Sequence, residues 1–177
     1  AEAAGALSVL ADAGIALRLV TGDEDGPANS VACAIGLAQD RVHAGCSPER
    51  KADIVESTGK PAVFVGDGIN DALALAGADC GISVQGASTA AVATAGVVIA
   101  SGGLDQVVVA WRHARRTVLV VRQNLVFSMA YNVLVLGLTS TGMVPPVAAA
   151  FAMLGSSLSV VLNTTRLGRV GHRQAAP

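Results

Sequence analysis

Three short polar motifs in the first half of the chain carry residue types that can handle phosphate groups. Thr21-Gly22-Asp23 offers a hydroxyl and an unobstructed backbone N–H, which suit an anionic oxygen. Lys51, in the first turn of an expected helix, supplies a mobile positive charge. The third motif, Gly66-Asp67-Gly68-Ile69-Asn70-Asp71, holds two carboxylates and an amide in one loop. Together the motifs predict a site for phosphate chemistry.

The third motif also predicts a magnesium site. Asp67 and Asp71 flank a glycine-containing turn, so both carboxylates can face one hard cation. Mg²⁺ prefers one or two carboxylates together with phosphate oxygens and water, and Asn70 can donate to a phosphate oxygen beside it. Each motif alone is also common in a plain turn or on a solvated helix. Their succession at the strand-to-helix junctions of one sheet favours the functional interpretation.

The elements around these motifs alternate between strands and helices. Short apolar runs predict strands at 15–20, 42–44, 62–65, 80–84 and 97–99. Helical patterns and caps predict helices at 3–13, 27–37, 47–58, 72–76 and 88–95. Apolar strands separated by helices indicate a parallel sheet with helices on both faces, and ligand sites in such sheets lie beyond the carboxyl ends of the strands. The predicted fold class is α/β.

The composition divides the chain into two unlike parts. Hydrophobic residues make up 52% and charged residues 14% of the chain, and the net charge is −1, which excludes a disordered chain and a generally basic nucleic-acid binder. All 13 acidic residues lie at or before Asp105. From Gln123 to Thr165 there is no Asp, Glu, Lys, Arg, His or Cys. We therefore expect a soluble part followed by a membrane part, with no nucleic-acid partner.

The second part predicts an amphipathic helix and two membrane spans. The amphipathic pattern runs over 104–122, and the apolar runs over 119–138 and 147–164 are long enough to cross a bilayer. Arginines flank the outer ends of the two spans and are missing from the turn between them, which predicts a hairpin with both ends in the cytoplasm. A buried helical hairpin of a soluble protein is the alternative.

These patterns predict three regions and a location. The regions are an α/β part at 1–103, a linker helix with two transmembrane helices at 104–170, and a cytoplasmic tail at 171–177. The soluble part is expected to be cytoplasmic on a multi-pass protein of the cell membrane. The three cysteines (Cys33, Cys46 and Cys80) fit a reducing compartment and agree with this orientation.

Polar residues inside the two spans form a soft, neutral ligand set. Tyr131 and Asn132 lie near the middle of the first span, and Met153 and Ser156 share one face of the second. A thioether with phenol, amide and hydroxyl oxygens suits Cu(I) or Ag(I), whereas Zn²⁺ and Co²⁺ sites favour carboxylate or imidazole. The alternative is that Met fills packing gaps while Ser and Asn join helices.

The three polar motifs resemble those of the phosphorylation domain of P-type ATPases, which has a haloacid-dehalogenase-like fold. The resemblance covers about residues 1–167 and implies that Thr21 and Lys51 hold an aspartyl phosphate. It also implies that Asp67 ligates Mg²⁺ with support from its neighbours in the motif. Catalytic roles are thus expected for Thr21, Gly22, Asp23, Lys51 and Asn70, and magnesium binding for Asp67 and Asp71.

The membrane part is similar to the last two helices of copper(I)-transporting P-type ATPases. In that family the matching residues contribute to transmembrane metal sites together with a C-P-C element, which would lie upstream. The expected Cu(I) residues are Tyr131, Asn132, Met153 and Ser156. The resemblance implies an ATP-driven exporter of Cu(I) or Ag(I) that uses Mg²⁺ and binds ATP mainly through an upstream domain. Its expected partners are the rest of the same pump, the membrane and a copper chaperone.

Two departures from the family pattern qualify this expectation. The D-K-T-G-T element with the phosphorylated Asp would lie upstream of residue 1, and Leu73 stands where the family usually has Pro. We expect the fragment alone to be inactive, because an acyl-phosphate mechanism needs its carboxylate nucleophile. The alternatives are a membrane-anchored phosphatase of the haloacid-dehalogenase type and a truncated pump remnant without catalysis.

Overall fold

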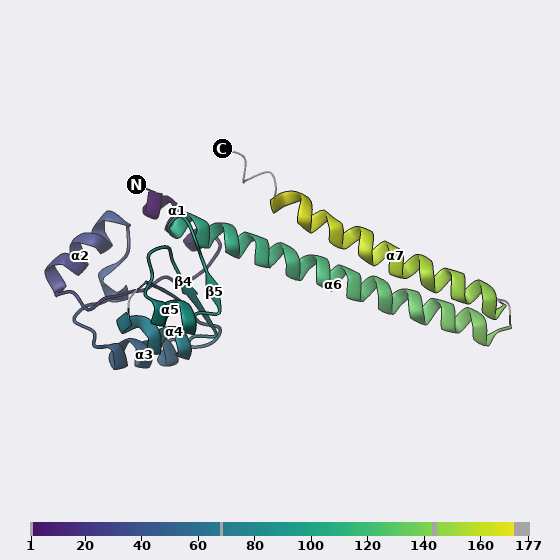
Figure 1. Cartoon of the computed structure of the whole chain (residues 1–177), viewed down its shortest axis with the longest axis horizontal. Helices are drawn as coiled ribbons and strands as arrows, with labels where there is room; N and C mark the ends of the chain where they lie inside the picture. Colours follow the sequence, from purple (N-terminus) through teal and green to yellow (C-terminus); the bar gives the residue numbers. More distant parts are fainter. Residues whose placement is uncertain (1, 68, 143–144, 172–177) are drawn as a thin grey trace. The chain divides into compact units, whose positions relative to one another are not determined.

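The chain forms two compact units, Ala1–Ala110 and Trp111–Pro177. The computed structural model, drawn in Figure 1, describes residues 2–67, 69–142 and 145–171. The sequence predicts a boundary at 103/104, where a helix begins, but the division falls one to two turns inside that helix. The reason is that the first turns of the helix pack into the core of the first unit. Apart from Gly171, the expected cytoplasmic tail lies outside the described residues.

The first unit contains the expected alternation of short strands and helices. Its strands are β1 (Leu19–Val20), β2 (Val42–His43), β3 (Val63–Gly66), β4 (Cys80–Ser83) and β5 (Val97–Val98). Its helices are α1 (Glu2–Asp12), α2 (Asp25–Ala34), α3 (Pro48–Ser57), α4 (Ala72–Gly77) and α5 (Thr89–Thr94), with single 3₁₀ turns at Gln39–Arg41 and Ile69–Asp71. The predicted helix starts at Ser47 and Ser88 are confirmed, since both hydroxyls accept from the backbone N–H three residues on.

All the strand pairs are parallel, as predicted, but they form two sheets instead of one. β1 pairs with β2 in one sheet, and β3, β4 and β5 follow in that order in the other. The expectation of a single sheet is therefore corrected. The physical reason is that β1 and β3 each pair along one edge only, and no strand of the described residues bridges the two remaining edges.

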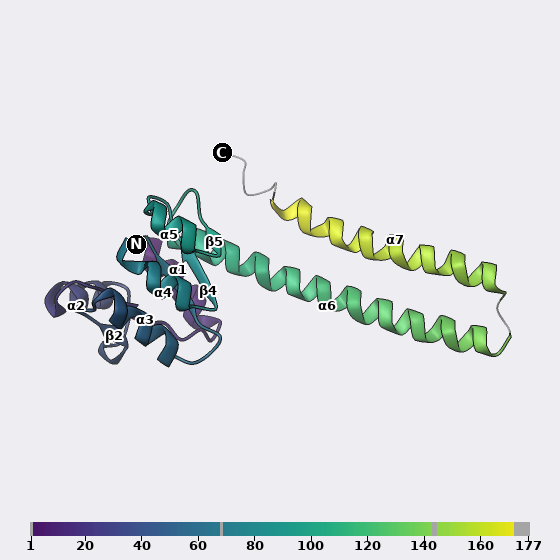
Figure 2. The same cartoon turned by 60° about the horizontal axis from the view of Figure 1, so that its bottom comes forward.

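Helices cover both faces of the three-stranded sheet, as Figure 2 helps to follow. On one face, α4 packs so closely that a Cβ on Gly81 would lie 2.5 Å from the Leu75 carbonyl oxygen. On the other face, Ile82 forms a core cluster with Ile99 and Val107. Neighbouring residues of a strand point to opposite faces. α4 therefore lies on the face of Gly81, and the core cluster lies on the face of Ile82.

The second unit consists of two long helices that lie side by side in opposite directions (Figures 1 and 2). α6 runs over Leu104–Ser140 and α7 over Pro146–Gly171. The predicted amphipathic helix and first span are thus one continuous helix. From residue 120 onward, half-buried side chains recur every three or four residues, which marks the faces in contact. We call this stripe the seam; its described members are Val120, Asn124, Ser128, Tyr131, Val135 and Thr139 on α6 and Ala152, Ser156, Val160 and Asn163 on α7.

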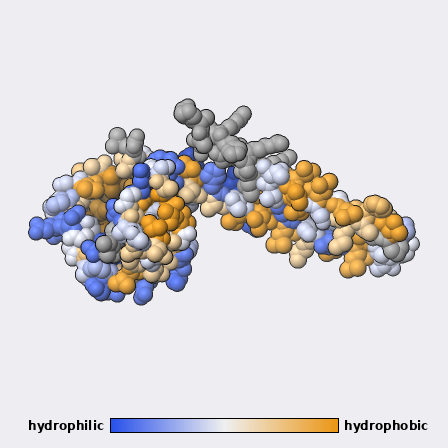
Figure 3. All heavy atoms as spheres, viewed as in Figure 1, coloured by the Kyte–Doolittle hydropathy of each residue, from blue (hydrophilic) through white to orange (hydrophobic). Residues whose placement is uncertain are grey.

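On the face seen in Figure 3, apolar side chains make up much of the surface of this helix pair. Phe127 and Phe151 are 73% and 71% exposed. Among the described residues, one helix, α6, is long and apolar enough to cross a membrane. The described apolar stretch of α7, Ala150–Thr165, is shorter than that length. The second span therefore stays a prediction.

Candidate active site and metal centre

A buried ion pair joins two of the predicted site residues. Lys51 Nζ lies 2.7 Å from Asp71 Oδ1, and both side chains are 12% exposed. Lys51 comes from α3, which begins at its Ser47 cap, and Asp71 precedes α4. The packing of α3 against α4 therefore brings the two charges together. Charges so far from water are maintained by their pairing, because either one alone would be costly to bury.

Gly66 leaves room for the Asp71 carboxylate at the end of β3. A Cβ on Gly66 would lie 2.9 Å from Asp71 Oδ2 and 3.0 Å from the ring of Phe64. Contacts this short are not tolerated without a shift of the neighbouring atoms. The first glycine of the motif is therefore needed for clearance, so that Asp71 can reach back to the strand end and meet Lys51.

Asp67 and Asn70 lie on the same loop but face solvent. Both are exposed, and the Asp67 carbonyl accepts from the Ser88 N–H at 2.9 Å, which fixes the backbone at this point. The two carboxylates of the motif thus differ, since Asp71 is engaged by Lys51 while Asp67 is open to a cation from solvent. An exposed carboxylate with an adjacent amide fits Mg²⁺ bound together with phosphate oxygens and water.

The Thr21 turn is held in place by the loop that leads into α3. Thr21 Oγ1 donates to Asp23 Oδ2 at 3.0 Å and accepts from the Asp23 N–H at 3.1 Å. The Thr21 carbonyl accepts from Cys46 N–H at 2.9 Å. Cys46 directly precedes the Ser47 cap of α3, the helix that carries Lys51. This hydrogen bond therefore connects the Thr21 turn to the start of the helix that carries Lys51.

Ser83 is a polar residue near the site that the sequence reasoning missed. It is fully buried, and among the described residues its hydroxyl has no hydrogen-bond partner. Ser83 pairs in register with Gly66, so its side chain lies on the sheet face on which Asp71 approaches Gly66. No signal in the sequence distinguishes this serine from a packing residue, because its burial depends on α4 and α5.

The four expected Cu(I) residues divide into two pairs in the second unit. Tyr131 and Ser156 are half-buried in the seam between α6 and α7. Asn132 is exposed, and Met153 is 62% exposed. In the described part of the helix pair, the four side chains therefore do not converge on one point. Tyr131 and Ser156 face the partner helix, while Asn132 and Met153 face outward.

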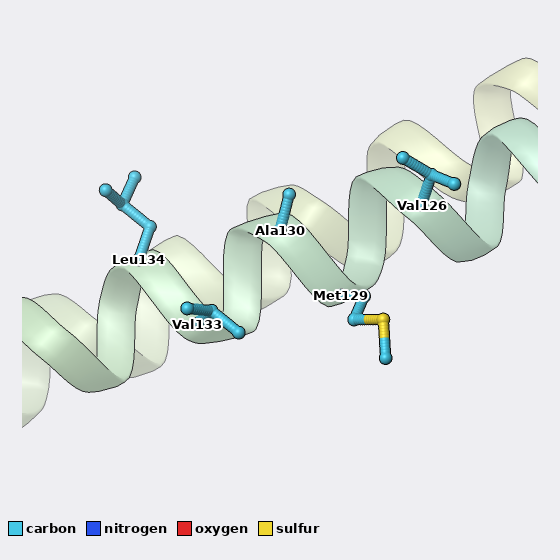
Figure 4. A pocket seen from close by; sticks show the side chains of 5 residues that line it. All are labelled: Val126, Met129, Ala130, Val133 and Leu134. Carbon is cyan, nitrogen blue, oxygen red and sulfur yellow. The ribbon is translucent and has the colours of Figure 1, made fainter.

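Met129, the methionine of the first predicted span, lies on an apolar surface. An open groove of about 510 Å³ on α6 is lined by Val126, Met129, Ala130, Val133 and Leu134, shown in Figure 4. All five side chains are apolar, and Met129 is 67% exposed. A soft metal would find one sulfur here and no second donor among these five. Met129 therefore lies on an exposed apolar surface of α6.

The comparisons with known proteins agree with the resemblance seen in the motifs. The haloacid dehalogenase-like hydrolase family model matches residues 1–79. The chain is 37% identical over 173 residues to a copper-exporting P-type ATPase of Mycobacterium tuberculosis, which covers 96% of this chain and 22% of that protein. It is 36% identical over 178 residues to cation-transporting P-type ATPase B of Mycobacterium leprae, covering 99% of this chain and 24% of that protein.

A solved structure is similar over both units. The crystal structure of a zinc-transporting PIB-type ATPase in the E2.Pi state matches with a TM-score of 0.89 and 32% identity, covering 94% of this chain and 28% of that one. The chain thus spans about a quarter of the length of these relatives. The first unit has a haloacid-dehalogenase-like fold, and the chain as a whole is homologous to a segment of the heavy-metal P-type ATPases.

Proposed function

We propose that this chain is part of an ATP-driven pump that exports Cu(I) or Ag(I) and works through an aspartyl phosphate formed on a segment upstream of residue 1. The observation that carries this proposal is the buried Lys51–Asp71 pair beside the exposed Asp67 at the end of β3. A positive charge and a cation-binding carboxylate at one strand end are what a transferred phosphate group requires.

Different residues of the first unit would contact different parts of the phosphate group. Lys51, oriented by Asp71, would neutralise one phosphate oxygen, and the Thr21 hydroxyl would donate to another after leaving Asp23. Asp67 would hold Mg²⁺, and Asn70 would donate beside it. When bound, Mg²⁺ supplies positive charge that offsets the charge of the phosphate group. Gly22 leaves its backbone N–H accessible to the same group.

The two separate sheets support an upstream strand with the phosphorylated Asp. The edges of β1 and β3 that lack a partner among the described residues would both be filled by one parallel strand. The carboxyl end of such a strand would lie between the Thr21 turn and Lys51. An Asp there would meet the groups that a phosphorylated carboxylate needs. ATP would be held mainly by a further upstream domain.

The second unit would supply part of the ion pathway. We place α6 and α7 as a transmembrane hairpin with the soluble unit in the cytoplasm, because the arginines flank its outer ends. Tyr131 and Ser156 would reach the ion from the seam. Asn132 and Met153 face outward, so other helices of the pump would complete the ion site to which these two residues contribute. A copper chaperone would deliver the ion to the pump.

The choice of ion depends on the donor types. The relatives are named for copper in one case and zinc in another, so their names alone do not decide it. Residues 123–165 carry no acid, histidine or cysteine. The remaining thioether, phenol, amide and hydroxyl donors favour Cu(I) or Ag(I) over Zn²⁺.

The test uses the full-length protein that contains this chain, in membrane vesicles. We expect Asp67→Ala to abolish the acid-stable phosphoenzyme formed from radiolabelled ATP, while Asp53→Ala, at an exposed position of α3, leaves it unchanged. Normal phosphoenzyme in Asp67→Ala would refute the assignment. Mg²⁺-dependent hydrolysis of small phosphoesters that Cu(I) does not stimulate would instead favour the membrane-anchored phosphatase.

A second measurement tests which ion stimulates the protein and whether Met153 binds it. Cu(I) and Ag(I) are expected to stimulate ATP hydrolysis, and Met153→Leu to weaken that stimulation while phosphorylation by inorganic phosphate persists. Met129→Leu is the matched control, since Met129 lies on the apolar groove of α6. Equal stimulation in the two variants would exclude Met153 as a ligand.

A further inference from the structure

Three polar side chains join α6 to α7 near one end of the seam. Asn163 Nδ2 donates to Asn124 Oδ1 at 2.8 Å, and Asn124 Nδ2 donates to the Thr164 hydroxyl at 3.1 Å. The Thr164 hydroxyl itself donates to the Val160 carbonyl of its own helix at 2.8 Å. Among the described side chains, the two bonds of Asn124 are the hydrogen bonds that link these helices.

These bonds restrict how the helices can slide along each other. The other seam residues of α7 are small or apolar, and their contacts are non-directional, so a shift by one turn would still bury them. A shift of one turn is about 5.4 Å, which breaks both bonds of Asn124. An unpaired amide inside an apolar seam is costly. The polar cluster therefore favours one register.

The same register relates two residues of the proposed ion site. Tyr131 follows Asn124 by seven residues, and Ser156 precedes Asn163 by seven residues. Seven residues are about two turns, or roughly 10 Å along the helix, so each pair lies on one helix face. Because the helices run in opposite directions, both steps lead the same way from the cluster. Tyr131 and Ser156 thus stand at the same level of the seam, and both are half-buried there.

We propose that Asn124 and Asn163 form an interhelical clamp, with Thr164 as its third member, which sets the register of α6 against α7 and holds Tyr131 opposite Ser156. The asparagines are positioning residues and do not touch the ion. The register of the helices stands on the hydrogen bonds alone. Its consequence for ion binding rests on the proposed function.

Disulfide cross-linking in the full-length protein tests the register directly. Val135→Cys with Ala152→Cys pairs two seam residues at one level, while Thr139→Cys with Ala152→Cys pairs residues one turn apart. Residues 81–177 contain no native cysteine, and mass spectrometry identifies the peptide that carries both introduced cysteines. The measured quantity is the ratio of the level pair to the shifted pair after mild oxidation.

Loss of the clamp should lower this cross-linking ratio, and the decrease should grow with the number of hydrogen bonds removed. Interhelical hydrogen bonds in membranes are worth about threefold each in an equilibrium. We expect Asn124→Leu with Asn163→Leu, which removes two bonds, to lower the ratio about ninefold and Thr164→Val about threefold. Thr164→Ser keeps the hydroxyl and should keep the ratio. Ser159→Ala is the matched control, because its hydroxyl donates within its own helix to the Gly155 carbonyl.

The outcomes separate the clamp from the function. An unchanged ratio in both Thr164→Val and the double asparagine variant overturns the clamp, and Thr164→Val decides alone if the double variant does not accumulate. In ATPase assays, Thr164→Val should raise the half-saturating Cu(I) concentration about threefold with phosphorylation by inorganic phosphate intact. A changed ratio with unchanged Cu(I) dependence removes the link to the ion site. A parent protein that Cu(I) does not stimulate refutes the proposed function, while the cross-linking ratio still decides the clamp.

Discussion

In the first unit apolar side chains lie inside, whereas in the second many lie outside and the seam between the helices contains polar side chains among apolar ones. Ala74 and Leu75 are almost completely buried under the sheet. Phe127 and Phe151 are largely exposed, while Asn124 and Asn163 pair between the helices. The inversion indicates that the two units are suited to different surroundings. The first is organised for water, and the second for lipid or for other apolar helices.

The largest expected effect concerns the buried Lys51–Asp71 ion pair of the first unit. Lys51→Met leaves the Asp71 carboxylate buried without its lysine, which should destabilise the packing of α3 on α4 by about 3–5 kcal/mol. Hydrogen exchange of α3 and α4 amides in the intact protein measures this loss. Lys60→Met is the control, because Lys60 is 76% exposed and lies 3.5 Å from Asp79.

A double variant sharpens the same test. Lys51→Met with Asp71→Leu removes both charges and should recover much of the lost protection, because the penalty comes from burying the Asp71 carboxylate without the lysine charge. If the double variant exchanges as fast as Lys51→Met alone, the pair is not the source of the stability.

The next largest effect tests whether the exposed apolar side chains of the second unit face lipid. Phe127→Asp places a charge on the exposed apolar face of α6 and should cost about 2.5–3.5 kcal/mol of insertion if that face meets lipid. The alkali-resistant membrane fraction of the protein measures it. Thr141→Asp, in the turn after α6, should insert normally. Equal insertion of the two variants would show that Phe127 does not face lipid.

A smaller effect is expected where the strand end meets the buried carboxylate. Gly66→Ala introduces a methyl group within 3.0 Å of Asp71 and Phe64 atoms, and such overpacking costs about 1–3 kcal/mol. Gly77→Ala is the matched control, since nothing lies within 4 Å of a Cβ there. Thermal unfolding of the two variants in the intact protein should differ by this amount, and identical midpoints would contradict the clearance role of Gly66.

The smallest expected effect is a pH dependence at the surface of the first unit. The Asp79 carboxylate accepts from the Ala62 N–H at 2.8 Å and lies beside Lys60, and these contacts hold its pKa below the ordinary value of 3.8. A lowered pKa in the folded state adds stability above that ordinary value, and this stability is lost as the pH falls through the folded pKa.

Asp79→Asn measures this contribution. The stability difference between the parent and the variant should be present at pH 7 and shrink below pH 3.8 as the carboxylate becomes protonated. A difference that stays constant over this range would show that the charge of Asp79 does not contribute.

The local signals of the sequence predicted the first unit well and the relations between distant residues less well. The Ser47 cap and the motif from Gly66 to Asp71 stand where the pattern indicated, because caps and turns depend on nearby residues. The contact of Lys51 with Asp71 depends on how α3 packs on α4, which no local pattern specifies. The two-sheet arrangement was likewise not predicted, because apolar runs indicate strands but do not specify which strands pair.

In the second unit, the sequence predicted helices but not their continuity or their contacts. The change from amphipathic to apolar pattern near Leu119 suggested two elements, yet no helix-breaking residue lies there, and α6 continues. Asn124 and Asn163 are separated by a whole hairpin, so their pairing follows from a register that neither residue's neighbours encode. The placement of Tyr131 in the seam and Asn132 outside it follows from the same register.

In the part of the chain that the structure describes, β1 and β3 each have one edge without a strand partner, which has a practical consequence for split-protein complementation. Strand edges with free N–H and C=O groups are templates for pairing with another chain. A synthetic peptide of strand-forming sequence, supplied in trans, could dock along β3, whose Val63 is 60% exposed. Reconstitution of the first unit from separate pieces is therefore expected to begin at this strand edge.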